Sequence, residues 1–189
     1  MKKIVVFASG SGSNAENIIV HFNKKNIAEV VAIFSNNENA KVLDRAKKFN
    51  IPTIVFSKEE FSTDVVLEKL KSFQPDLIVL AGFLLKFPQN IIESYPNQII
   101  NIHPALLPKY GGKGMYGMYV HKSVLENKEI ETGISIHYVN EHYDEGNIIF
   151  QKNISLENCT TPEEIAEKVH QLEHQYFPKV IEQILNPKS

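Results

Sequence analysis

Cysteine and long apolar runs are scarce in this sequence, and both absences narrow the class of protein. Cys159 is the only cysteine among 189 residues, which excludes a framework of disulfides. A single thiol is typical of a reducing compartment, so we expect a cytoplasmic protein. No apolar run reaches the roughly 20 residues of a membrane-spanning helix, so we expect no membrane partner.

Concentrated charge of one sign is absent as well. The 20 Lys and Arg residues are balanced by 22 Asp and Glu residues, and both kinds are dispersed along the chain. Proteins that bind nucleic acids usually gather basic residues, so we expect no nucleic-acid partner. The hydrophobic fraction of 43% is ordinary for a globular protein, and the length suits a single domain over residues 1–189.

Short apolar runs alternate with helical patterns through the first half of the chain. Strands are predicted at residues 4–8, 30–35, 53–56, 76–81 and 99–102. Helices are predicted at residues 14–24, 40–49, 61–73 and 88–93. This rhythm with short connections predicts an α/β fold with a doubly wound, mostly parallel sheet.

The second half of the sequence predicts two further strands that extend this sheet. Strands at residues 132–139 and 148–154 flank the polar loop 140–147, so they should pair antiparallel, and a helix is expected at 120–126.

A long C-terminal helix is predicted to follow. Thr161 is its expected N-cap and Pro162 its first residue, and Pro178 should kink it. Its buried face, at helical spacing, should comprise Ile165, Val169, Leu172, Tyr176, Val180 and Ile184.

Asn101 and His103 form the most informative pair in the chain, because they stand where a buried strand ends. Side chains two residues apart in extended backbone point to the same side, and Pro104 favours extended geometry at His103. An amide beside an imidazole can polarise a carbonyl and move a proton. The alternative is a pair of polar residues that only caps the strand.

A glycine-rich loop, residues 9–14, joins the first strand to the first helix. Its backbone N–H groups and the helix dipole favour an anion, so we interpret it as a phosphate site. Ser13 and Glu16 have the spacing of a capping box. Ala15 replaces the third glycine of the dinucleotide fingerprint, which disfavours that interpretation, and a tight turn without ligand remains the alternative.

Asp144 lies in the polar loop between the last two strands. Asp-Glu-Gly suits a turn, which is one interpretation. The other is that Asp144 folds over the strand ends and faces His103. A carboxylate there would raise the pKa of the imidazole and keep it able to donate a proton near neutrality.

These segments together resemble a known family. The matching segments, in order, are Ser9-Gly10-Ser11-Gly12-Ser13-Asn14, Leu80-Ala81-Gly82-Phe83, Asn101-Ile102-His103-Pro104-Ala105-Leu106-Leu107-Pro108-Lys109-Tyr110 and Asp144-Glu145-Gly146. The chain resembles, over essentially its whole length, the phosphoribosylglycinamide formyltransferases, folate-dependent enzymes of purine synthesis. The Asn-x-His-Pro-x-Leu-Leu-Pro run is highly specific for formyl-tetrahydrofolate enzymes.

The resemblance implies a Rossmann-like formyltransferase fold and a reaction. A formyl group would pass from 10-formyltetrahydrofolate to the amine of glycinamide ribonucleotide, with no metal. Asn101 and His103 would stabilise the oxyanion, His103 would transfer a proton to the leaving nitrogen, and Asp144 would support His103 and order a water.

The resemblance also implies the binding residues. The ribonucleotide would be held by Gly12, Ser13, Asn14 and Glu173. The folate would be held by Leu84, Leu85, Lys86, Phe87 and Asn101, with loop 141–144 closing over it. We expect small-molecule substrates and a monomer or homodimer.

The chain departs from the family's pattern in three places. Tyr110 is followed by a longer loop, residues 111–119, which either reshapes the substrate mouth or is a tolerated insertion. Leu85 and Lys86 reverse an often basic-then-apolar order, so pterin contacts there must use the backbone. His170 stands where a glutamine is usual, which puts that ribonucleotide contact in doubt.

Other functions remain as alternatives. His170 to His174 spells H-x-x-E-H, an inverted zinc-protease motif, although no third ligand is evident. A formyltetrahydrofolate hydrolase usually carries an N-terminal regulatory domain, and a methionyl-tRNA formyltransferase a C-terminal tRNA-binding domain; we expect neither. A non-enzymatic phosphosugar-binding module would need the glycine loop but not His103.

Overall fold

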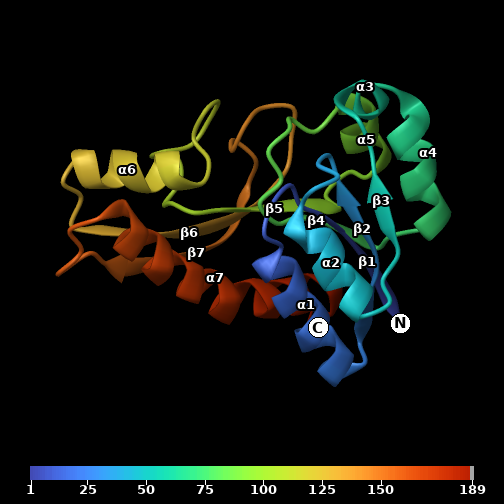
Figure 1. Ribbon diagram of the computed structural model, residues 1–189, viewed down its shortest axis with the longest axis horizontal. Coiled ribbons are helices and arrows are strands. Elements are labelled where there is room, and N and C mark those ends of the chain that lie inside the picture. Colours follow the sequence, from blue (N-terminus) through green and yellow to red (C-terminus); the bar gives the residue numbers. More distant parts are fainter. Residues whose placement is uncertain (188–189) are drawn as a thin grey trace.

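The computed structural model describes residues 1–187, which are built around a seven-stranded sheet of order β3-β2-β1-β4-β5-β6-β7 (Figure 1). The strands are β1 (Lys2–Phe7), β2 (Ala28–Ser35), β3 (Thr53–Val55), β4 (Leu77–Leu80), β5 (Ile99–His103), β6 (Glu131–Tyr138) and β7 (Ile148–Ser155). The first five run parallel, whereas β6 is antiparallel to β5 and β7 to β6. The predicted fold class is therefore confirmed.

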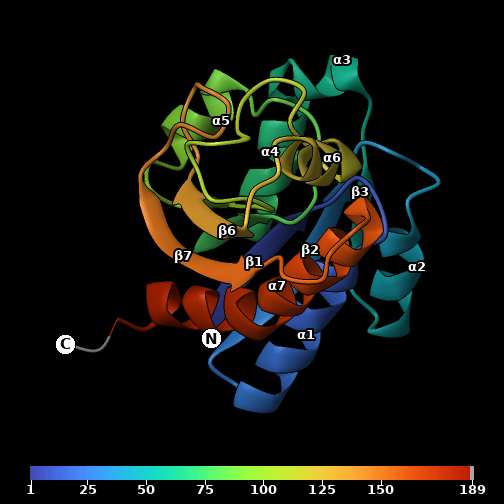
Figure 2. The same ribbon diagram turned by 90° about the vertical axis from the view of Figure 1, so that its left-hand side faces the viewer.

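The helices cover both faces of this sheet. They are α1 (Ser13–Lys25), α2 (Lys41–Lys48), α3 (Lys58–Phe61), α4 (Asp64–Phe73), α5 (Gln89–Ser94), α6 (Met118–Glu126) and α7 (Pro162–Leu185). Figure 2 shows α1 and α7 side by side on one face, with α4 and α5 on the other. Within residues 1–187, none of the helices combines the length and the apolar character that a bilayer crossing requires.

The single helix predicted at residues 61–73 is in fact two helices. Ser57 caps α3 through a capping box with Glu60, and α3 ends at Phe61. Thr63 then caps α4, its hydroxyl accepting the Val65 N–H at 3.4 Å. Ser57 and Thr63 each start a helix of their own, with extended backbone at Thr63 between the two, and the apolar periodicity alone did not reveal this break.

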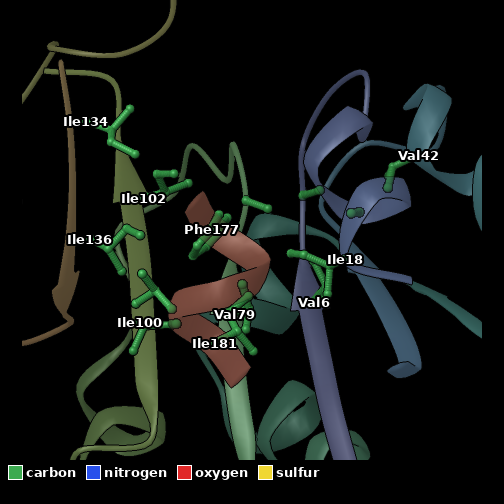
Figure 3. Close-up of a cluster of buried hydrophobic side chains, with 14 of the residues drawn as sticks. Val6, Ile18, Val42, Val79, Ile100, Ile102, Ile134, Ile136, Phe177 and Ile181 are labelled. Carbon is green, nitrogen blue, oxygen red and sulfur yellow. The ribbon is translucent and has the colours of Figure 1, made fainter. Parts of the chain in front are cut away.

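A buried cluster joins the sheet to α1 and α7. In Figure 3, side chains from β1, β4, β5 and β6 pack against Ile18 of α1 and against Phe177 and Ile181 of α7. The predicted face of α7 is correct at Ile165, Val169, Leu172 and Val180. It is wrong at Tyr176 and Ile184, which are only half-buried at the rim, because the core takes their neighbours Phe177 and Ile181.

Helix α7 passes through Pro178 without interruption. Proline has no N–H, so the carbonyl of His174, four residues earlier, lacks its intrahelical donor. Asn17 of α1 supplies one, its Nδ2 donating to that carbonyl at 2.8 Å. The predicted start of α7 is confirmed, with Thr161 and Glu164 forming a capping box.

Candidate active site

A cavity of about 750 Å³ opens at the carboxyl ends of the parallel strands. Its walls come from the segments that follow β1, β4 and β5, from the loop after β6, and from one face of α7. It contains every site residue expected from the sequence, namely Gly12, Ser13, Asn14, Leu84, Leu85, Lys86, Phe87, Asn101, His103, Asp144 and Glu173. Ligands of open α/β sheets bind at this edge.

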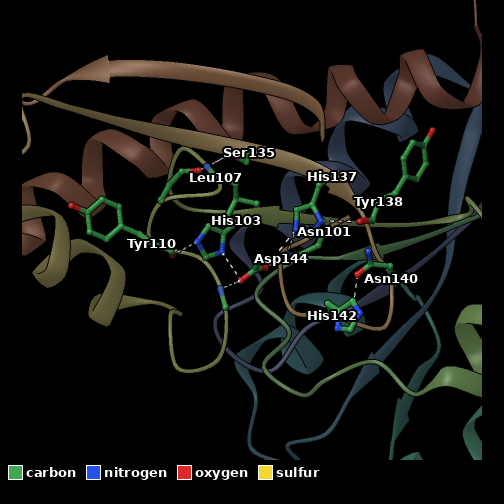
Figure 4. Close-up of polar contacts among 12 residues, drawn as sticks. Asn101, His103, Leu107, Tyr110, Ser135, His137, Tyr138, Asn140, His142 and Asp144 are labelled. Carbon is green, nitrogen blue, oxygen red and sulfur yellow. Dashed lines mark hydrogen bonds and ion pairs between the residues drawn. The ribbon is translucent and has the colours of Figure 1, made fainter. Parts of the chain in front are cut away.

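Asn101, His103 and Asp144 meet at one end of the cavity (Figure 4). The two Asp144 oxygens face different partners. Oδ2 lies 3.6 Å from His103 Nδ1, and Oδ1 lies 3.5 Å from Asn101 Nδ2. The contact between Asp144 and the pair from β5, open at the level of sequence, is therefore present.

Burial, rather than Asp144, sets the direction of the His103 pKa. The ring is only 3% exposed, and this desolvation lowers its pKa below 6.5 although Asp144 acts to raise it. The expectation of a raised pKa at His103 was therefore wrong. Burial alone would raise the pKa of Asp144, but His137, His103 and the Gly112 N–H together hold it below its ordinary value.

His137 is a member of this cluster that the sequence reasoning missed. It pairs with Asn101 across β5 and β6 and is 2% exposed. Its Nδ1 lies 2.8 Å from the Tyr138 carbonyl, which only accepts hydrogen bonds, so Nδ1 carries the hydrogen. In the neutral ring Nε2 then accepts from Asn101 Nδ2 at 3.1 Å, which orients the amide. The available signal was a titratable side chain in a buried stretch of β6, whose other buried polar residues are Thr132 and Ser135.

The glycine loop is shaped by Gly12 rather than by a capping side chain. Gly12 is the N-cap of α1 with φ of 73°, and no side chain caps this end, so the predicted Ser13–Glu16 capping box was wrong. Glu16 instead pairs with Arg45. The first intrahelical bond is donated by the Glu16 N–H to the Gly12 carbonyl at 2.9 Å. The residues at this helix start, Gly12, Ser13 and Asn14, line the cavity, and free N–H groups at a helix N-terminus favour an anion.

Asn14 and Glu173, both expected at the ribonucleotide, touch each other. Asn14 Nδ2 donates to Glu173 Oε2 at 2.8 Å, and His170 Nδ1 lies 3.1 Å from the same oxygen. Among residues 1–187, no group donates to the buried Asn14 Oδ1 atom, so it is an acceptor available to a bound group. His170 also lines the cavity, and its contact with Glu173 raises its pKa.

The expected folate segment, residues 84–87, forms another part of the cavity wall. The Leu84 N–H donates to Ser9 Oγ at 3.1 Å, which ties this segment to the glycine loop. Leu84 is 49% exposed at the mouth, whereas Phe87 is 4% exposed and packs against Phe7 and Phe61. Ser9 was missed as a positioning residue because its partner lies far away in sequence.

The longer loop after Tyr110 forms part of the cavity wall. Gly112, Met115, Tyr116 and Met118 line it, which favours the first of the two interpretations of this departure from the family's pattern. Elsewhere, the H-x-x-E-H motif gains no third ligand, since no cluster of three His, Cys, Asp or Glu able to hold a metal occurs within residues 1–187.

Comparison with known proteins agrees with this geometry. The sequence profile of the Formyl transferase family matches residues 2–181. A phosphoribosylglycinamide formyltransferase of Bacillus subtilis is 36% identical and covers 98% of this chain and 95% of its own length. A chloroplastic one of Arabidopsis thaliana is 37% identical over 95% of this chain, which spans only 64% of that relative.

Solved structures give the same result. The crystal structure of a phosphoribosylglycinamide formyltransferase from Anaplasma phagocytophilum has a TM-score of 0.90 and 29% identity, covering 99% of this chain and 88% of that one. The corresponding enzyme from Coxiella burnetii has a TM-score of 0.88 and 36% identity, covering 97% and 87%. With its profile match, its relatives and its fold in agreement, this chain belongs to the formyl transferase family.

Proposed function

We propose that this protein formylates glycinamide ribonucleotide, using 10-formyltetrahydrofolate as the donor, in purine biosynthesis. The observation that carries the proposal is the convergence of Asn101, His103 and Asp144 in the cavity that also contains the glycine loop. The relatives and solved structures named above carry the same activity in their names.

The reaction forms one C–N bond and breaks another. The ribonucleotide amine adds to the formyl carbon, and the resulting oxyanion collapses with loss of the folate nitrogen. The amine must lose a proton and the leaving nitrogen must gain one. The products are formyl-glycinamide ribonucleotide and tetrahydrofolate.

Asn101 stabilises the oxyanion, and His103 moves the proton from the amine to the leaving nitrogen. One Asn101 N–H is held by His137, whereas the other makes only the 3.5 Å contact to Asp144 and is available to the oxyanion. One such donor contributes about 3 to 4 kcal/mol in other enzymes. His103, neutral because its pKa is lowered, takes the amine proton and returns it to the leaving nitrogen, and Asp144 stabilises the charged ring in between.

The two substrates enter from different sides of the cavity. Gly12, Ser13 and Asn14 hold the ribonucleotide phosphate with backbone N–H groups, and Glu173 contacts the same substrate. Leu84, Leu85, Lys86 and Phe87 hold the pterin, with apolar contacts and main-chain groups, and loop 141–144 closes over it. Leu84 and Tyr143, exposed at the mouth, suit a flat aromatic ligand.

The remaining properties follow the same proposal. The protein acts in the cytoplasm on small molecules, as a monomer or homodimer and as a single domain over residues 1–189. It uses no metal, nucleic acid or membrane partner.

The test measures tetrahydrofolate release with and without glycinamide ribonucleotide. His103→Ala and Asp144→Asn are expected to lose at least about 100-fold in kcat while still binding the ribonucleotide, because these side chains act on the transition state. Asp44→Asn, the same change at an exposed carboxylate on α2, is the control and should match the wild type.

Two outcomes would reject the proposal. Wild-type turnover that persists without ribonucleotide would identify a formyltetrahydrofolate hydrolase. Tight ribonucleotide binding with no turnover under either condition would identify a phosphosugar-binding module.

A further inference from the structure

One short segment, residues 110–112, contacts both members of the His103–Asp144 pair. The Tyr110 carbonyl lies 2.7 Å from His103 Nε2, and the Gly112 N–H donates to Asp144 Oδ2 at 3.0 Å. Figure 4 shows the His103 ring between the Tyr110 backbone and Asp144.

A carbonyl oxygen only accepts hydrogen bonds, so His103 Nε2 carries a hydrogen and donates it to Tyr110. In the neutral ring Nδ1 is then the nitrogen with the lone pair, and Nδ1 faces Asp144 at 3.6 Å. The backbone at Tyr110 therefore decides which ring nitrogen exchanges a proton.

We propose that residues 110–112 are a positioning element of the active site, which directs proton exchange to Nδ1 of His103. The kinetic part of this inference rests on the proposed function, whereas the tautomer does not. In this arrangement the amine proton arrives at Nδ1, next to Asp144, and leaves from the same atom, while the other hydrogen stays on Nε2 and is donated to the Tyr110 carbonyl throughout.

The side chain of Tyr110 holds this backbone in place. Tyr110 has φ of 57°, a left-handed conformation that is unfavourable for a residue with a side chain. Its hydroxyl donates to Glu129 Oε1 at 2.8 Å on the outer side of the loop. Burial and this bond raise the pKa of Tyr110 to about 12, so the phenol remains a donor.

Gly111 completes the element because the space beside it is full. A Cβ built there would lie 2.5 Å from Leu107 Cδ2 and 3.3 Å from Asp144 Cβ. A side chain at position 111 would therefore clash with Leu107 and crowd the Cβ of Asp144. The segment continues into the loop that lines the substrate mouth, so the wall of the cavity and the catalytic pair share one piece of backbone.

Other charged or titratable groups face His103 as well. Asp144 and Glu173 favour the charged ring, whereas His137 disfavours it, and His121 of α6 is also near enough to interact. A pH profile of activity alone would mix these contributions, so the decisive measurement observes the ring nitrogens themselves.

The experiment records ¹⁵N spectra of the histidine side chains in the intact protein, with His103 assigned by comparison with His103→Gln. At high pH the wild type should show His103 with hydrogen on Nε2 and a lone pair on Nδ1. Tyr110→Phe removes only the bond to Glu129, and we expect a mixture of tautomers and a kcat about five- to tenfold lower at unchanged KM.

Lys109→Met is the matched control. Lys109 also binds Glu129, at 2.9 Å, but lies at the surface and contacts neither catalytic residue. It should leave the spectrum and the kinetics as in the wild type. Gly111→Ala is a second variant, expected to lower kcat by displacing Asp144 while the Nε2 hydrogen remains.

The wild-type spectrum tests the inference even if a variant fails to fold or the protein does not transfer formyl groups. Hydrogen on Nδ1 in the neutral wild-type ring would overturn it. So would a Tyr110→Phe variant whose tautomer and pH profile of kcat both equal those of the wild type.

Discussion

His121 is a buried imidazole in the cavity wall whose Nδ1 has no hydrogen-bond partner in the described chain. It is 5% exposed, and desolvation lowers its pKa below 6.5. In the unfolded chain the ring binds a proton more readily. The folded state therefore loses stability relative to the unfolded state as pH falls below about 6.5.

His121→Leu should reduce the pH dependence of stability. We expect the drop in unfolding free energy between pH 7.5 and 5.5 to shrink by on the order of 1 kcal/mol, since Leu takes up no proton. Urea unfolding at the two pH values measures this. Val124→Ala, a cavity-forming change on the same helix, should destabilise equally at both, and an equal response of the two variants would contradict the prediction.

At the scale of single residues, the sequence offered the meeting of Asn101, His103 and Asp144 as one of two interpretations of the Asp144 loop, and it gave the wrong direction for the pKa of His103. The i, i+2 spacing was sufficient for the first two, whereas Asp144 was a candidate from its place in the polar loop and the family resemblance favoured it. The degree of burial of His103 depends on the surrounding loops, so the direction of its pKa could not be read from neighbours in sequence. His137 was missed because its role depends on pairing across two strands.

At the scale of elements, α7 depends on α1 for one of its own hydrogen bonds. Pro178 leaves the His174 carbonyl without an intrahelical donor, and Asn17 fills that position at 2.8 Å. A proline inside a helix is thus compensated by a residue more than 150 positions away in the chain.

Asn17→Ala should cost about 1 to 2 kcal/mol of unfolding free energy, because a half-buried carbonyl loses its partner. In a Pro178→Ala background the new N–H serves that carbonyl, so the same change should cost much less. Denaturant titration of the wild type, the two single variants and the double variant gives the coupling free energy between positions 17 and 178. Asn23→Ala, exposed on the same helix, should have little effect, and strict additivity would refute the compensation.

The glycine loop supports a second prediction at this scale. A Cβ at Gly12 would lie 2.4 Å from Val42 Cγ2 and 2.7 Å from the Val42 Cα, and φ there is positive. Gly12→Ala should therefore weaken ribonucleotide binding and destabilise the fold by about 2 kcal/mol or more. Gly10→Ala, with no atom within 4 Å, should keep wild-type stability. Titration calorimetry measures ribonucleotide binding and urea unfolding measures stability, so the two effects are separated.

Element boundaries show where sequence reasoning was limited. All seven strands lie where the sequence predicted them. The central parallel strands are continuously hydrophobic, whereas β6 and β7 were predicted as a pair that flanks a polar loop. The end of α3 and the N-cap of α1 were missed, since both depend on backbone dihedrals at Thr63 and Gly12. The face of α7 was partly missed, because Tyr176 and Phe177 are both apolar and only packing decides between them.

At the scale of the whole molecule, the cavity couples folding to its ligands. A ligand at 100 times its Kd stabilises the folded state by about 2.7 kcal/mol. We expect glycinamide ribonucleotide to do so for wild type and for His103→Ala alike, as followed by urea unfolding. If His103→Ala lost this stabilisation, the ring would be a binding residue rather than one that acts on the transition state.

The order of the strands also fixes the distance between the glycine loop and His103, and so the length of substrate that can react. The glycine loop follows β1 and His103 ends β5, and β4 alone lies between those strands. Two interstrand spacings amount to about 10 Å, a separation fixed by backbone hydrogen bonds rather than by adjustable side chains. A phosphorylated amine must span that length to be formylated. A shorter one would fill the anion position and leave its nitrogen out of reach, so it would inhibit without reacting.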